Sequence, residues 1–226
     1  MAAIFISFSG IDGAGKSTQI QQLKNHLADE GIPVREFTLW DDVVVLRRLR
    51  TGFSKRILQS DGEVGTPAQP SDRRDKNVQS WPLLLARCGL YLADTIRLRR
   101  VIRKAQSQAS GVVIFDRYIY DQLAALPLDS RLARAFACGL LKLAPRPNIS
   151  YLLDAVPEEA RARKPEYPLE FMRRYRSCYL ALRALAQLDM IPAGSPEEVH
   201  AAVLTRLQQY TVESTREAQL SSAVVA

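Results

Sequence analysis

Short apolar runs alternate along the 226-residue chain with longer segments that carry a helical repeat. The run at 3–8 predicts a buried strand, and Ile20, Leu23 and Leu27 share one face of a helix expected at 19–30. Further strands are expected at 33–40, 111–116, 149–154 and 188–192, and further helices at 42–50, 82–104, 131–143, from 157, after 168, and from 196 to about 210. This alternation is typical of an α/β fold, in which helices cover both faces of a parallel sheet.

Helix signals and chain breakers set the boundaries of these elements. Pro157 followed by two acids is a good helix start, and Ser195 and Glu198 form a capping box around Pro196. Residues 52–80 are rich in Gly, Pro and polar residues, and a loop of about 30 residues is usually either functional or disordered. We expect a single domain over 1–210, while 211–226 has no clear pattern and is interpreted as a tail without stable structure.

Composition narrows the class of protein. Hydrophobic residues make up 47% and charged residues 24%, as in globular proteins, and no run of about 18 apolar residues predicts a membrane span. The chain enters its first strand without a basic leader, so no signal peptide is expected. Cys88, Cys138 and Cys178 lie far apart, which favours free thiols in the cytoplasm over a disulfide framework or a zinc site.

The net charge of +7 suits a polyanionic ligand. The basic residues are spread over several segments, and no basic run is interleaved with aromatic residues. We therefore expect a nucleotide as the partner, and neither a nucleic acid nor a membrane.

Residues 10–18 read G-x-x-x-x-G-K-S-T, a complete phosphate-binding loop between a strand and a helix. The helix N-terminus and the turned backbone N–H groups favour a polyphosphate, while Lys16 should reach the β- and γ-phosphates and Ser17 should ligate Mg²⁺. The residues expected to hold the nucleotide here are Gly10, Gly13, Ala14, Gly15, Lys16, Ser17 and Thr18.

Two further groups of residues suit phosphoryl transfer. Asp116 ends a strand at the edge where ligands of parallel sheets bind, so it could ligate Mg²⁺ or orient the acceptor. Arg117 beside it is a planar donor for phosphate. Arg161, Arg163 and Lys164 form a cationic group before a Pro-rich break, and we interpret residues 157–168 as a lid that closes over phosphates.

These pieces resemble the thymidylate kinase-like family of P-loop nucleoside monophosphate kinases. The matching segments are 8–18, 113–118, 143–149, 151–154 and 157–161, in the order found in the family. The resemblance implies a three-layer P-loop kinase fold with a five-stranded parallel sheet in the order 2-3-1-4-5. It also implies ATP and Mg²⁺ as cofactors, a nucleoside monophosphate as acceptor, and a homodimer.

The resemblance also assigns roles to single residues. Asp12 matches the loop carboxylate that faces the acceptor, and Arg117 matches the arginine that contacts the acceptor phosphate. Gly13 stands where some members carry a catalytic arginine, so Arg161 and Arg163 of the lid are the expected catalytic arginines. Ala193 begins a segment similar to the one that packs near adenine.

The acceptor half departs from the family pattern. Residues 119–123 replace a serine pair and an aromatic that line the thymidine pocket, and Tyr120 is our candidate ligand there. Residues 38–42 replace an Arg- and Gly-rich segment, and Arg97 only partly fits the arginine expected under the base. The segments 116–121 and 162–166 are similar to a divergent branch of the family.

Three hypotheses remain open from the sequence. The first is an ATP- and Mg²⁺-dependent kinase that acts on dTMP or a related nucleoside monophosphate. The second is a P-loop kinase with a non-nucleotide acceptor, such as a sugar or another phosphorylated metabolite. The third is a nucleotide-binding regulator without catalysis, whereas a GTPase is disfavoured because the chain has no N-K-x-D motif.

Overall fold

The computed structural model describes residues 3–45, 81–108 and 110–225, except the side chains of 81–84, 108, 217, 218 and 220–225. Five strands form one sheet in the order β2-β3-β1-β4-β5, and every pairing is parallel. The strands are β1 (Ile4–Ser9), β2 (Val34–Thr38), β3 (Val112–Asp116), β4 (Ile149–Leu153) and β5 (Asp189–Ile191). The expected fold class and strand order are therefore confirmed.

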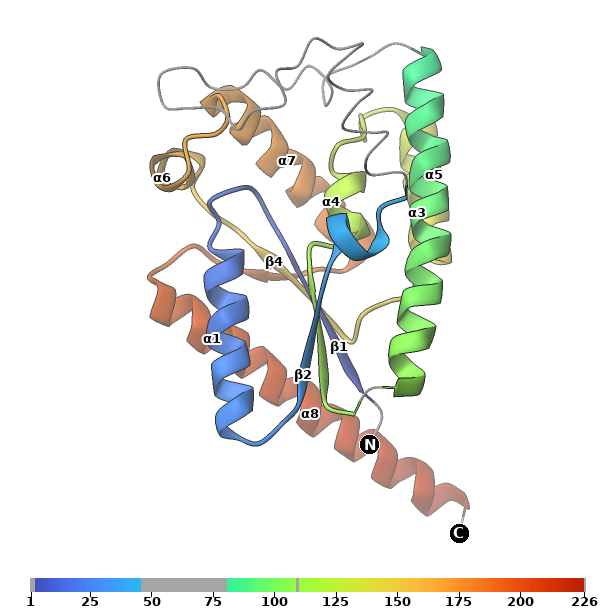
Figure 1. Ribbon diagram of the computed structural model, residues 1–226, viewed down its shortest axis with the longest axis vertical. Helices are drawn as coiled ribbons and strands as arrows, with labels where there is room; N and C mark the ends of the chain where they lie inside the picture. Colours follow the sequence, from blue (N-terminus) through green and yellow to red (C-terminus); the bar gives the residue numbers. More distant parts are fainter. Residues whose placement is uncertain (1–2, 46–80, 109, 226) are drawn as a thin grey trace.

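Helices cover both faces of this sheet and give the fold three layers. In Figure 1, α1 and α8 lie on one side of the sheet, and α3 and α5 lie on the other. The helical elements are α1 (Lys16–Asp29), the π-helical turn η1 (Leu39–Val43), α3 (Trp81–Gln108), α4 (Ile119–Leu123), α5 (Arg131–Leu143), α6 (Pro157–Arg163), α7 (Leu169–Ala186) and α8 (Pro196–Val225).

The central strands are apolar on both faces because each face is covered. Ile6 and Phe8 of β1, and Ile114 and Phe115 of β3, expose none of their surface. Phe8 pairs with Asp116, so the carboxyl ends of β1 and β3 lie side by side at one edge of the sheet. This edge is where ligands of open parallel sheets bind.

Local signals in the sequence place several boundaries correctly. The backbone N–H of Ser195 donates to Glu198 Oε2 at 2.8 Å, and the backbone N–H of Glu198 donates to Ser195 Oγ at 3.2 Å, so the capping box is confirmed. Pro157 opens α6, with Glu158 and Glu159 in its first turn.

The helix expected at 42–50 is wrong over its described part. Residues 39–43 form a π-helical turn, and Val44 is extended. Asp42 Oδ2 accepts the backbone N–H of Thr38 at 2.7 Å, and the Val45 N–H donates to the buried Asp94 at 2.7 Å. These side-chain acceptors replace the backbone bonds of a regular helix. Residues 46–50 and the loop predicted at 52–80 lie outside the described residues.

The last helix is longer than predicted. We expected it to end near Tyr210, but α8 continues to Val225 and projects beyond the sheet (Figure 1). Residues 211–216 are exposed, so they carry no apolar stripe that a sequence pattern could reveal.

A membrane-spanning helix was not expected from the sequence. Within the described ranges, no helix combines the length and the apolar content that crossing a bilayer requires.

Candidate functional site

The loop between β1 and α1 has the backbone geometry of a phosphate cradle. Gly13 and Gly15 adopt φ angles of 81° and 87°, in the left-handed region that favours glycine. A Cβ on Gly13 would lie 2.3 Å from the backbone oxygen of Ala160 in α6, whereas a Cβ on Gly15 would meet no atom within 4 Å. The loop therefore packs directly against the helix that we interpreted as part of a lid.

Lys16 lies inside this loop and is only 6% exposed. Its Nζ donates to the backbone oxygens of Gly10 and Ile11, at 2.9 Å each. Burial, followed by the positive charge of Arg117, lowers the pKa of Lys16 to about 8. Ser17 and Thr18 follow in the first turn of α1, with exposed side chains.

Asp116 lies at the carboxyl end of β3, between the ends of β1 and β2. Its Oδ1 is buried without a hydrogen-bond partner, and burial raises the pKa of the carboxyl group. A buried carboxylate oxygen without a donor is costly unless a cation balances it. Asp116 and the Ser17 hydroxyl therefore fit the hard oxygen ligands that Mg²⁺ prefers. No group of three or more His, Cys, Asp or Glu side chains that could hold a metal occurs within the described ranges, so protein ligands alone would be few.

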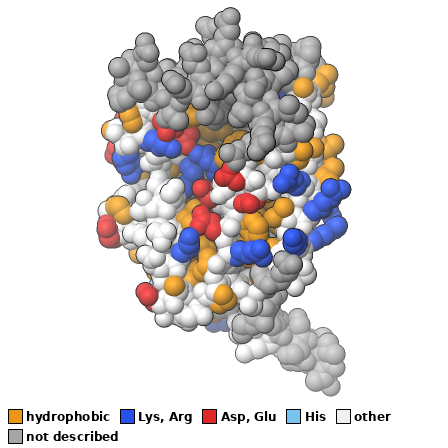
Figure 2. Space-filling model, in the orientation of Figure 1, with side chains coloured by type: hydrophobic (Ala, Val, Ile, Leu, Met, Phe, Trp, Pro, Cys, Tyr) orange, Lys and Arg blue, Asp and Glu red, His pale blue; other side chains and the backbone are white. Residues whose placement is uncertain are grey.

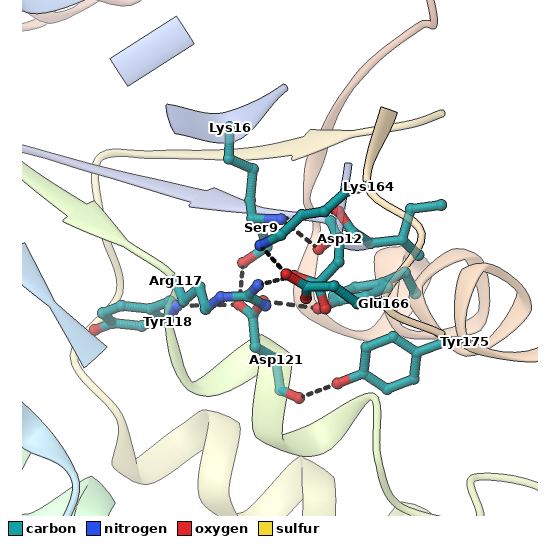
Figure 3. Close-up of polar contacts among 12 residues, drawn as sticks. Ser9, Asp12, Lys16, Arg117, Tyr118, Asp121, Lys164, Glu166 and Tyr175 are labelled. Atoms are coloured by element: carbon teal, nitrogen blue, oxygen red, sulfur yellow. Dashed lines mark hydrogen bonds and ion pairs between the residues drawn. The ribbon is translucent and has the colours of Figure 1, made fainter. Parts of the chain in front are cut away.

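Arg117 connects the loop to the end of β3. Its guanidinium is held between Asp12 of the loop and Asp121 of α4, with Nη1 3.1 Å from Asp121 Oδ1 (Figure 3). Its backbone has a φ of 67°, which is unusual for a residue other than glycine, and its N–H donates to Phe8 O at 3.0 Å. Burial disfavours the charged guanidinium, but Asp121 and Asp12 more than offset this and raise the pKa of Arg117.

The sequence did not single out Asp121 as a functional residue. Its carboxylate accepts from the hydroxyls of Ser9 and Tyr179, from the Tyr118 N–H and from Arg117. The spacing of four residues between Arg117 and Asp121, typical of ion pairs on a helix, is the one signal that could have revealed it.

The segment expected to act as a lid lies beside this cluster. Arg161 is half-buried and its Nε has no hydrogen-bond partner, whereas Arg163 is exposed at the end of α6. Lys164 Nζ lies 3.1 Å from Glu166 Oε1, and both side chains point toward the group formed by Asp12 and Arg117 in Figure 3. That one of these arginines is catalytic stays a prediction.

Within the described residues, three predicted ligands make no hydrogen bond or ion pair with this cluster. Tyr120 is buried, and its hydroxyl lies 3.1 Å from Ser150 Oγ of β4, so the structure gives it a place in the core. Arg97 is exposed on α3, and Ala193 is exposed in the connection before α8. Their assignment to the acceptor or to adenine stays a prediction, and for Tyr120 the core contact does not support it.

Comparison with known proteins agrees with this geometry. A thymidylate kinase of Chlorobaculum parvum is 28% identical over 238 aligned positions, which cover 92% of this chain and 97% of the relative. A probable thymidylate kinase of Archaeoglobus fulgidus is 29% identical over 78% of this chain and 81% of its own. A probable thymidylate kinase of Methanosphaera stadtmanae is 25% identical over 84% and 90%. No protein-family model matches the chain.

The strand order, the phosphate-binding loop and the Asp116–Arg117 pair define a P-loop protein of the nucleotide kinase class. Similarity to several thymidylate kinases over most of both chains makes the assignment more specific. Over most of its length the chain is thus similar to thymidylate kinases, at 25–29% identity.

Proposed function

We propose that the protein transfers a phosphoryl group from ATP to a nucleoside monophosphate, with dTMP as the acceptor. The observation that carries this proposal is the position of Arg117, an anion-binding side chain held beside the buried Lys16 of a complete phosphate-binding loop. Lys16 suits the donor phosphates and Arg117 suits the acceptor phosphate, and in-line transfer requires both phosphates to be held. The relatives named thymidylate kinase support dTMP as the acceptor.

In this proposal each charged group has a separate role. Lys16 leaves its loop carbonyls to contact the β- and γ-phosphates, while Asp12 faces the acceptor and orients Arg117 on the acceptor phosphate. Arg161, with its unpartnered Nε, and the exposed Arg163 would stabilise the charge on the transferred group from α6, which packs against the loop.

Ser17 and Asp116 would hold Mg²⁺, which when bound supplies charge neutralisation at the phosphate oxygens. We expect Asp116→Asn to raise the Mg²⁺ concentration needed for tight ATP binding about tenfold. Titration of ATP by calorimetry at several Mg²⁺ concentrations measures this, with Asp29→Asn, an exposed aspartate at the end of α1, as the matched control. Equal Mg²⁺ dependence in both variants would contradict the assignment.

A coupled assay for ADP with a panel of nucleoside monophosphates and sugar phosphates tests the acceptor class. Turnover is expected with dTMP and should be lost in Arg117→Ala.

A second candidate, a kinase with a non-nucleotide acceptor, is favoured by the core position of Tyr120 in a segment where the family lines its thymidine pocket. Turnover with a sugar phosphate but with no nucleotide would select that candidate, and no turnover with any acceptor would favour a binding protein.

A homodimer in the cytoplasm is also part of the proposal. Leu85, Leu92 and Ile96 are exposed along α3. Helix α3 lies at the right of Figure 1, and on that side Figure 2 shows apolar and basic side chains together. Their burial against a second copy would remove apolar surface from water. The cysteines are free thiols, which suits a reducing compartment. Light scattering should give twice the monomer mass of 25.3 kDa, and a monomer at all concentrations would exclude the dimer.

A further inference from the structure

Asp121 is a buried carboxylate whose two oxygens are both hydrogen-bonded within the site. It is 2% exposed, and its two oxygens accept four hydrogen bonds, one from β1, one from α7 and two from the connection between β3 and α4. Oδ2 accepts Ser9 Oγ of β1 at 2.7 Å and the Tyr118 N–H at 3.1 Å. Oδ1 accepts the Tyr179 hydroxyl of α7 at 2.7 Å and Arg117 Nη1 at 3.1 Å.

Two simpler explanations of this arrangement are insufficient. Capping of α4 accounts only for the bond from the Tyr118 N–H. Direct binding of the acceptor would need a free oxygen lone pair, but an ionised carboxylate has about four acceptor positions, and four donors already occupy them. Asp121 therefore acts through its neighbours rather than on a ligand.

Among the neighbours of Asp121, Arg117 is the side chain whose orientation the carboxylate restricts. Its side chain is long and flexible, and a free guanidinium would lose several rotamers when it binds a phosphate. Asp121 on one side and Asp12 on the other already fix the guanidinium plane (Figure 3). Such preorganisation lowers the cost of binding the acceptor phosphate.

Helix α7 supplies the support behind Asp121. The Tyr179 hydroxyl donates to the same oxygen that faces Arg117, whereas the Tyr175 hydroxyl donates to the backbone oxygen of Asp121 at 2.7 Å. Tyr175 and Tyr179 are both buried on one face of α7. Two similar hydroxyls thus hold the side chain and the backbone of one residue, and the two tyrosines also interact with each other.

We propose that Asp121 is a positioning residue that aims the Arg117 guanidinium at the acceptor phosphate, and that Tyr179 holds the Asp121 carboxylate in that orientation. This inference rests on the proposed function, because it concerns the acceptor of the same site. It assigns a role to a residue in the segment that departs from the family pattern.

The test compares Asp121→Asn and Tyr179→Phe with Tyr175→Phe as the matched control. Asp121→Asn should raise the KM for dTMP about tenfold or more and leave the KM for ATP within about twofold, because a neutral amide holds the Arg117 guanidinium less strongly than a carboxylate does. Tyr179→Phe should raise the KM for dTMP about threefold, while Tyr175→Phe should leave it within about twofold. If Asp121→Asn does not fold, the comparison of Tyr179→Phe with Tyr175→Phe still tests the proposal.

A second readout does not depend on turnover. In the wild type, the Nη–H groups of Arg117 should give resolved NMR signals, because two carboxylates restrict rotation of the guanidinium. These signals should broaden in Asp121→Asn and Tyr179→Phe and persist in Tyr175→Phe.

The outcomes separate the two proposals. A wild type that phosphorylates no acceptor removes the proposed function, while the Arg117 signals still decide the positioning role. An unchanged KM for dTMP in both variants, equal increases for dTMP and ATP, an equal effect of Tyr175→Phe, or unrestricted Arg117 signals in the wild type would overturn the inference.

Discussion

Lys16 has a pKa that its burial in the site lowers well below the ordinary value. Its ammonium group is nearly buried, and two loop carbonyls satisfy it. Burial and Arg117 lower its pKa from 10.5 to about 8, so the folded protein releases a proton over a range in which the unfolded chain keeps it. The cost of the buried charge is thus fully present below about pH 8 and is relieved as the pH rises toward 10.5.

This pKa predicts how ATP binding responds to pH. A polyphosphate favours the charged ammonium, so ATP affinity should fall as the pH rises through about 8, and binding should take up protons in that range. Calorimetry in buffers of different ionisation enthalpy at pH 7, 8 and 9 measures the uptake. Lys16→Met should bind ATP more weakly and lose the uptake, and the same pH dependence in this variant would assign the titration to another group.

At this scale the sequence reveals residues that belong to a local motif and misses residues that depend on long-range packing. Lys16, Ser17, Asp116 and Arg117 follow directly from a loop or a strand end. The full set of hydrogen bonds to Asp121 forms only because α7 brings Tyr179, 58 residues away in sequence, to its carboxylate. Conversely, Tyr120 turns into the core toward Ser150, although its neighbours in sequence belong to the site.

At the scale of elements, α6 and the phosphate-binding loop form one packed unit. The close approach of Gly13 to the backbone of Ala160 leaves no room for a side chain. Strands and amphipathic helices were predictable because apolar periodicity records burial. The π-helical turn at 39–43 and the short helix α4 were not, since side-chain contacts from Asp42, Asp94 and Asp121 determine them.

The packing of α6 predicts a difference between two glycines with similar φ angles. Gly15→Ala should cost about 1–2 kcal/mol of unfolding free energy from left-handed strain alone. Gly13→Ala should cost more, because its Cβ also meets Ala160 and must displace α6. Urea unfolding of both variants measures the two free energies of unfolding. An equal loss in both would show that α6 moves away from the new Cβ at no cost.

At the scale of the whole molecule, the C-terminal helix α8 is attached to the β4–β5 side of the sheet. The Tyr151 hydroxyl of β4 donates to Val203 O at 2.8 Å, and Arg206 Nε lies 2.9 Å from Asp189 Oδ1 of β5. Asn148 Nδ2 donates to the Tyr210 hydroxyl at 2.6 Å. These contacts fasten the first half of α8 to the sheet.

Truncation should therefore have an effect that depends on where the helix is cut. Deletion of 212–226 should lower Tm by only a few degrees, since the contacts named above lie at or before Tyr210. Deletion of 203–226 removes all three contacts and should destabilise the fold strongly. Thermal unfolding measures both, and a large loss on the shorter deletion would show that the extension supports the fold.

In the proposed function, the phosphate-binding loop and the Asp116–Arg117 pair form one phosphotransferase site. The most direct measurement is chromatographic separation of products after incubation with Mg²⁺, ATP and dTMP. The wild type should convert dTMP to dTDP with equal formation of ADP, and Lys16→Ala and Arg117→Ala should lose this conversion. If no dTDP and no other phosphorylated nucleotide forms from a monophosphate panel, and Lys16→Ala binds ATP as the wild type does, the protein is not a kinase of this class.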